Sequence, residues 1–206
     1  MTIKDFGTRV ADVWEGLRPG TRRMVVGAML QQTPSTPNPS AGQKFYYDAQ
    51  SDWELSRLLT ALDDRAVDAE ARKNPTNFRE LRRIADATAR VLEAQTESAE
   101  IFIQLVERAL LRYDYARVDM LADALTARFS AAEVCEIVRQ AEHAPVRALA
   151  FEALAQIPVS RLYPLIDDPL YADIVRIALE QQAFEFESEE ARMLLEQLMA
   201  EELFGD

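Results

Sequence analysis

The feature that most constrains the fold is a long stretch of helical sequence that glycine does not interrupt. Of the six glycines in the chain, Gly205 alone lies beyond residue 42. From about residue 52 apolar side chains recur every three to four positions, and no alternation of apolar and polar residues runs for more than a few positions. The pattern predicts an all-α domain of about nine helices, near 52–72, 76–95, 97–112, 115–129, 131–141, 144–157, 159–166, 170–184 and 188–203.

Residue types that favour helix ends mark several boundaries in this stretch. Thr76, which follows Asn74-Pro75, and Thr96 are predicted N-caps, since a Thr hydroxyl accepts a hydrogen bond from a free backbone amide. Ser130 followed by Glu133 is a capping-box pattern. The sequence therefore predicts separate helices that are joined by short connections.

The first 51 residues differ from the rest of the chain. Residues 1–32 are predicted to form an amphipathic helical arm, and residues 33–51, which begin with three closely spaced prolines, a linker to a helical-repeat domain at 52–206. Residues 1–52 hold six bases and five acids, whereas the remainder holds 17 bases and 30 acids. Trp14, Arg22 and Arg23 are candidate residues for contact with a partner or a second copy. The arm could equally dock on its own acidic body or on a membrane surface.

The later helices repeat their apolar pattern with a period close to 28 residues. A shift by 28 places Val118 on Val146, and a shift by 29 places Val146 on Val175 and Ile157 on Phe186. Because one helix pair cannot bury its own apolar stripe, a fixed period near 30 residues favours stacked pairs. A plain helical bundle is the alternative. The predicted pairs are 115–142, 143–170 and 171–203.

Residues 144–168 resemble one HEAT-type repeat. Val146-Arg147 opens the first helix, small residues follow, and Asp167-Asp168 comes after the second helix, while Val175-Arg176 begins a second match. Val118 departs from the pattern, since Asp119 follows it in place of Arg. The resemblance implies a right-handed α-α superhelix, a HEAT-like solenoid, that binds partners, usually on the face of its second helices. It implies no reaction.

Four residues of the predicted second helices are candidate partner contacts: Arg139, Arg161, Tyr163 and Arg192. Arg and Tyr side chains are favoured in protein interfaces, where they act as anchors. The alternative is that each arginine pairs with one of the many acids of its own chain. A protein partner is therefore the first expectation for this face.

The chain offers little of the chemistry that enzymes use. His143 and Cys135 are its only His and Cys, and the common phosphate-loop motifs do not occur. His143 is predicted to serve a helix C-terminus, where a cation is favoured, and Cys135, which has acidic neighbours, is predicted to pack rather than to react. We predict no catalytic residue, cofactor or metal. The formal net charge of −12 also argues against a nucleic-acid partner.

Three functional hypotheses remain, and the first of them leads. The chain could be a non-enzymatic scaffold or adaptor for a protein partner, a small helical enzyme that uses carboxylates or a bound metal, or an acidic inhibitor that mimics nucleic acid. Its longest apolar run near the start covers residues 24–30, far short of the roughly 20 residues that span a bilayer. A cytoplasmic protein without a membrane partner is expected.

Overall fold

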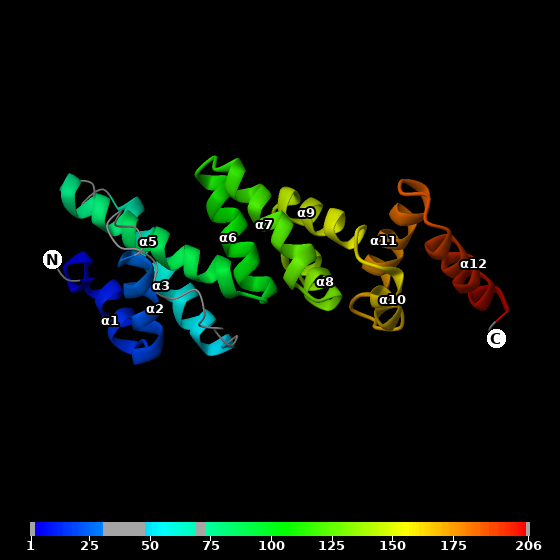
Figure 1. The fold of residues 1–206 in the computed structure, drawn as a ribbon, viewed down its shortest axis with the longest axis horizontal. Helices are drawn as coiled ribbons and strands as arrows, with labels where there is room; N and C mark the ends of the chain where they lie inside the picture. Colours follow the sequence, from blue (N-terminus) through cyan, green and yellow to red (C-terminus); the bar gives the residue numbers. More distant parts are fainter. Residues whose placement is uncertain (1–2, 31–47, 69–72, 205–206) are drawn as a thin grey trace. The chain divides into compact units, whose positions relative to one another are not determined.

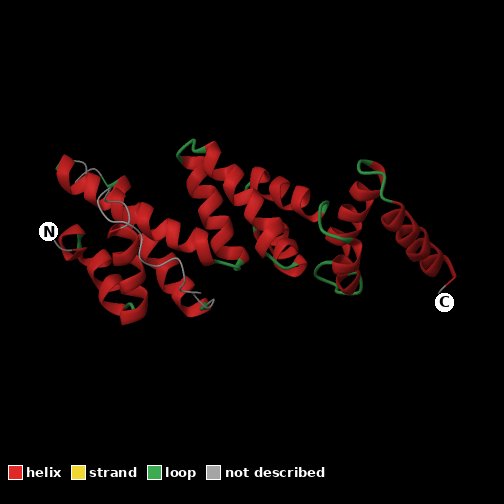
Figure 2. Ribbon diagram, in the orientation of Figure 1, coloured by secondary structure: helices red, strands yellow, loops and turns green. Residues whose placement is uncertain are grey.

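A computed structural model of the chain describes residues 3–30, 48–68 and 73–204, the side chains of Lys4 and of residues 201–204 excepted. Regular structure in these segments consists of eleven α-helices and two short 3-10 helices, with no strand (Figure 2). The predicted all-α fold is confirmed. The predicted count of about nine is lower than eleven, because it covered the helices from residue 52 onward and left aside the two α-helices that lie in the predicted helical arm at 1–32.

The described helices belong to two compact units, residues 1–96 and 97–206. In unit 1, α1 packs against η1 and α3, and α2 packs against α5 and α3 (Figure 1). Its elements are η1 (Ile3–Phe6), α1 (Thr8–Gly16), α2 (Pro19–Leu30), α3 (Ala49–Val67) and α5 (Pro75–Gln95).

This division differs from the predicted boundary between an arm, a linker and a repeat domain. Val10, Leu17 and Val25 are buried, and the helices that carry Val10 and Val25 contact α3 and α5, whose own leucines are buried. The N-terminal segment therefore contributes to the core of unit 1, which is the self-docking alternative. Residues 31–47 lie outside the described residues, so most of the linker predicted at 33–51 stays a prediction, while residues 49–51 begin α3.

The N-cap of α5 and the role of Thr96 differ from the prediction. Asn74, rather than Thr76, is the N-cap, and its side chain accepts hydrogen bonds from the amides of Thr76 and Asn77. Pro75 takes the first helical position, where a missing N–H costs nothing. Thr96 ends α5 and does not start the next helix.

Unit 2 contains the rest of the described helices. Here α6 packs on α7 and α8 packs on α9, while α6 also contacts α8 and α7 contacts α9. The first two predicted pairs are therefore out of phase, because α7 and α8 share no extensive contact within the described residues, whereas α11 packs on α12 as the predicted pair 171–203 requires. The elements are α6 (Ala99–Leu111), α7 (Tyr115–Arg128), α8 (Ala131–Gln140), α9 (Ala144–Leu154), α10 (Val159–Leu162), η2 (Tyr163–Leu165), α11 (Ala172–Phe184) and α12 (Glu189–Phe204).

A single carboxylate links the starts of α6 and α8. The Ser130 hydroxyl accepts from the Glu133 amide, as the capping-box pattern predicts. The Glu133 carboxylate does not complete the box, because it accepts from the amide of Ala99 at 2.9 Å. Ser98, the N-cap of α6, makes no side-chain capping bond. Glu133 thus serves the free amide end of α6, where a negative charge is favourable.

Candidate functional site

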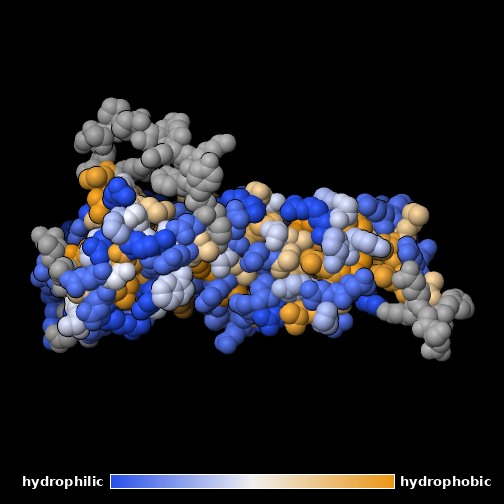
Figure 3. Space-filling view, turned by 90° about the horizontal axis from the view of Figure 1, so that it is seen from below, coloured by the Kyte–Doolittle hydropathy of each residue, from blue (hydrophilic) through white to orange (hydrophobic). Residues whose placement is uncertain are grey.

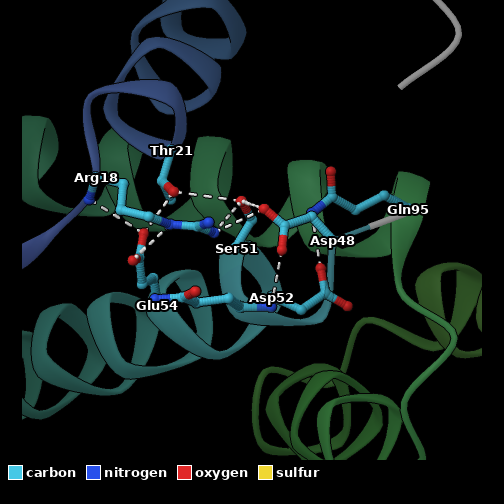
Figure 4. Close-up of polar contacts among 8 residues, drawn as sticks. Arg18, Thr21, Asp48, Ser51, Asp52, Glu54 and Gln95 are labelled. Carbon is cyan, nitrogen blue, oxygen red and sulfur yellow. Dashed lines mark hydrogen bonds and ion pairs between the residues drawn. The ribbon is translucent and has the colours of Figure 1, made fainter. Parts of the chain in front are cut away.

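Unit 1 contains a network of polar side chains where the α1–α2 junction meets the start of α3 (Figure 4). Arg18 Nε lies 2.9 Å from Glu54 Oε1, and Arg18 Nη2 lies 2.7 Å from Asp48 Oδ2 and 2.9 Å from Ser51 Oγ. The Thr21 hydroxyl donates to the Glu54 carboxylate. Thr21, Ser51 and Glu54 are buried, so this network replaces the water that these polar groups lose on folding.

The contacts of this network indicate a structural role. Asp48 also caps α3 by accepting from the Gln50 amide, and hydrogen bonds from Ser51 and Arg18 lower the pKa of the Asp48 carboxyl. Each charge faces an opposite charge or a hydrogen-bond donor, so none is left to act on a ligand. The network joins residues on either side of 31–47 and thereby holds the N-terminal segment to α3.

No local sequence pattern indicated this network, because its two halves, Arg18 with Thr21 and the start of α3, lie 30 or more residues apart. The spacing of Asp48 and Ser51 at the start of α3 was a capping signal that could have pointed to one half of it. The partner Arg18 had no sequence signal beyond its place in the break between α1 and α2.

The candidate contacts of the N-terminal segment have different surroundings. Trp14 is half-buried in α1, and Arg22 of α2 is partly buried and donates to the carbonyl of Glu15. Arg23 is exposed and forms no ion pair with another residue of the described segments. Arg22 is therefore engaged within its own unit, and Arg23 is the arginine of this group that faces solvent.

Two of the candidate arginines in unit 2 pair with acids of their own helices. Arg139 lies 2.8 and 2.5 Å from the two carboxylate oxygens of Glu136 in α8. Arg192 lies 2.6 Å from Glu189 at the start of α12. Both arginines therefore pair with acids of their own chain, which was the alternative to contact with a partner.

Arg161 and Tyr163 form the remaining pair of candidates. Both are exposed, and they lie two residues apart where α10 passes into η2. Within the described part of the chain, no ion pair or side-chain hydrogen bond engages either of them. Of the four predicted contacts on the second helices, these two are the ones that remain open to a partner.

Glu136 links α8 to the start of α11. Besides Arg139, its carboxylate accepts a hydrogen bond from the Tyr171 hydroxyl at 3.1 Å. The hydrogen bonds from Arg139 contribute most to lowering the pKa of Glu136, to about 2 from an ordinary 4.5. The ionised carboxylate therefore stabilises the folded unit.

Replacing Glu136 by Gln is expected to lower the free energy of unfolding by about 1 kcal/mol at neutral pH, because charge-assisted hydrogen bonds are lost. Since the folded-state pKa is depressed, this contribution is present above pH 4.5 and is lost as the pH falls through about 2. Urea unfolding of wild type and variant at a series of pH values measures it. A difference that stays constant down to pH 2, or an equal loss in Glu152→Gln at an exposed acid of α9, would contradict this role.

The only His and Cys take structural positions. His143 precedes α9, and its Nδ1 lies 2.7 Å from Glu107 Oε1 of α6, so it joins two helices and does not serve a helix C-terminus as predicted. Cys135 is buried, and burial raises the pKa of its thiol to about 12. A thiol with this pKa is not a nucleophile at neutral pH, in line with the predicted packing role.

The surface that sequence reasoning missed lies at the connection between α11 and α12. Phe184, Phe186 and Met193 are all exposed there. Phe186 was predicted to be the equivalent of Ile157, which is buried. Figure 3 shows hydrophobic atoms among hydrophilic ones at the end where Figure 1 places α11 and α12. One signal was available, since apolar residues occupy most of the circumference of α12, more than a single partner helix can cover.

The chain was compared with known proteins. No protein-family model, curated protein or solved structure matched this chain. Within the described segments, no helix combines the length and the apolar character that a membrane span needs. The same segments contain no group of three or more His, Cys, Asp or Glu side chains placed to hold a metal ion.

Proposed function

We propose that this chain is a non-enzymatic helical scaffold that binds a protein partner. The observation that carries the proposal is the exposure of large apolar side chains on unit 2, since such side chains at a protein surface mark interaction sites when they gather. The exposed set comprises Leu111, Tyr113, Tyr115, Met120, Tyr163, Leu170, Ile177, Phe184, Phe186, Met193 and Met199.

The fold that we propose for unit 2 is a HEAT-like superhelix. Its support is the nearest-neighbour packing of α6 on α8 and of α7 on α9, which stacks one helix pair on the next. Val118, Val146 and Val175, which are equivalent in the repeat, are all buried. The guanidinium of Arg147 donates to the carbonyls of Ala141 and Glu142 at the end of α8, and so joins adjacent helices.

The residues themselves favour binding over catalysis. The only imidazole is engaged with Glu107, and the only thiol is buried. Tyr163 and Arg161 are of the residue types that are enriched among interface anchors, and both are exposed, two residues apart, where α10 passes into η2. We therefore assign the first partner contact to these two residues.

Affinity purification with the full chain from extracts of its source organism tests the proposal. We expect the double variant Arg161→Glu, Tyr163→Ala to lower the recovery of at least one specific protein by about fivefold or more, because interface anchors carry most of the binding energy. The control variant Val26→Ala, Val67→Ala, at two exposed apolar side chains of unit 1, should retain that protein. The proposal fails if wild type, this variant, the control and a variant of the α11–α12 connection all recover the same proteins in equal amounts.

A further inference from the structure

We infer that the connection between α11 and α12 binds a basic amphipathic helix of a partner protein. The inference rests on the proposed scaffold function and names the chemistry of one partner. The surface, called here the hairpin tip, consists of three apolar side chains and three acids: Phe184, Phe186, Met193, Glu185, Glu187 and Glu190.

The apolar side chains of the hairpin tip are largely exposed to solvent. The exposed fractions are 80% for Phe184, 58% for Phe186 and 68% for Met193. Ile177, which lies seven residues before Phe184 and hence on the same face of α11, is also exposed. Phe rings and the flexible Met side chain bury much apolar area and adapt to different partners. The hairpin tip therefore offers an apolar contact that nothing within the described residues covers.

Acidic side chains alternate with these apolar ones. Glu185, Glu187 and Glu190 are exposed, and the only base of residues 181–206, Arg192, is paired with Glu189 at 2.6 Å. The same stretch contains eight acids. The charge that the hairpin tip presents to a partner is thus strongly negative, and the complementary partner is basic.

Charge also decides between the possible occupants. A second copy would bring its own hairpin, with the same excess of acids, against this one, and juxtaposed like charges oppose binding. A helix with an apolar stripe between rows of Lys or Arg matches both features, since its stripe covers the apolar side chains while its cations meet the glutamates. The hairpin tip is therefore suited to a basic amphipathic helix.

A fluorescence anisotropy titration of the full chain tests this partner chemistry. The probe is a labelled amphipathic peptide of Leu and Lys, about two heptads long. We expect Phe184→Ala, Met193→Ala to weaken its binding by about tenfold, because two exposed anchors are lost. The matched control is Val26→Ala, Val67→Ala in unit 1, whose side chains are 44% and 71% exposed, and its effect should stay under about twofold.

A second pair of variants tests the role of charge. Glu187→Gln, Glu190→Gln should weaken binding by about threefold to tenfold at low salt, whereas Asp119→Asn, Asp123→Asn in α7 should change it little. A scrambled peptide of the same composition should bind more weakly, since it lacks the apolar stripe.

Three results would overturn the inference. These are an equal loss in the tip variant and in its control, equal binding of the scrambled peptide, and self-association of the full chain that Phe184→Ala, Met193→Ala abolishes. The last result would identify a second copy as the occupant. If the probe fails while Arg161→Glu, Tyr163→Ala still loses a natural partner, the inference is wrong and the scaffold function stands.

Discussion

A carboxylate introduced at position 25 is expected to unfold unit 1, whereas the same carboxylate at position 26 should leave it folded. Val25 of α2 is fully buried, and Val26 is 44% exposed. Burial of an unpaired carboxylate costs several kcal/mol, which is comparable to the whole stability of a small unit. An exposed substitution usually changes stability by about 0.5 kcal/mol or less.

Hydrogen exchange of α3 and α5 measures this effect in the full chain. Val25→Asp should remove the protection of both helices, because α2 packs against them. Val26→Asp adds the same charge to the same helix and so controls for net charge and helix propensity. Unchanged protection in Val25→Asp would show that residues 1–30 form an arm separate from α3 and α5, and would contradict the packing described for unit 1.

The second large effect is expected at Glu54. Its side chain is 7% exposed, and it holds Arg18 Nε at 2.9 Å as well as the Thr21 hydroxyl. Glu54→Ala leaves these donors without their acceptor and should cost about 2–3 kcal/mol, less than a fully buried pair would because water reaches part of the Arg18 side chain. Urea unfolding of the full chain, followed by a signal from unit 1, measures the loss.

The chain provides a matched control for this prediction. Arg9 and Asp64 also join the N-terminal segment to α3, with 2.8 Å between Nη1 and Oδ2, but both side chains are more than half exposed. Asp64→Ala should therefore cost about 0.5 kcal/mol or less, since exposed ion pairs contribute little. Equal losses in the two variants would mean that burial does not increase the contribution of the Glu54 network to the free energy of unfolding.

Much of the fold followed from local patterns. The period of the apolar residues and the scarcity of glycine predicted helices whose bounds lie within a few residues of those in the structure, and Ser130 was correctly identified as a cap. These features act within one or two helical turns, so a single sequence displays them. Thr76 and Thr96 were assigned wrongly because Asn74-Pro75 and Ser98 compete for the same helix starts.

The arrangement of helices and the candidate sites depended on longer-range contacts. The apolar stripe of α7 fits either α6 or α8 as its neighbour, and the structure places it against α6 and α9. Arg18 and Glu54 lie 36 residues apart, so no local pattern pairs them. Phe186 follows the apolar pattern of the repeat but is exposed. Periodicity alone could not predict this, because it does not indicate which apolar side chains lack a neighbouring helix to cover them.

Hydrogen–deuterium exchange of the full chain, with and without the Leu/Lys peptide, tests most directly the proposal that the C-terminal hairpin of unit 2 binds a basic amphipathic helix. We expect added protection in residues 172–200, loss of that protection in Phe184→Ala, Met193→Ala, and no change in α7. Protection that is absent, that spreads evenly over the chain, or that persists in the variant would contradict the proposal.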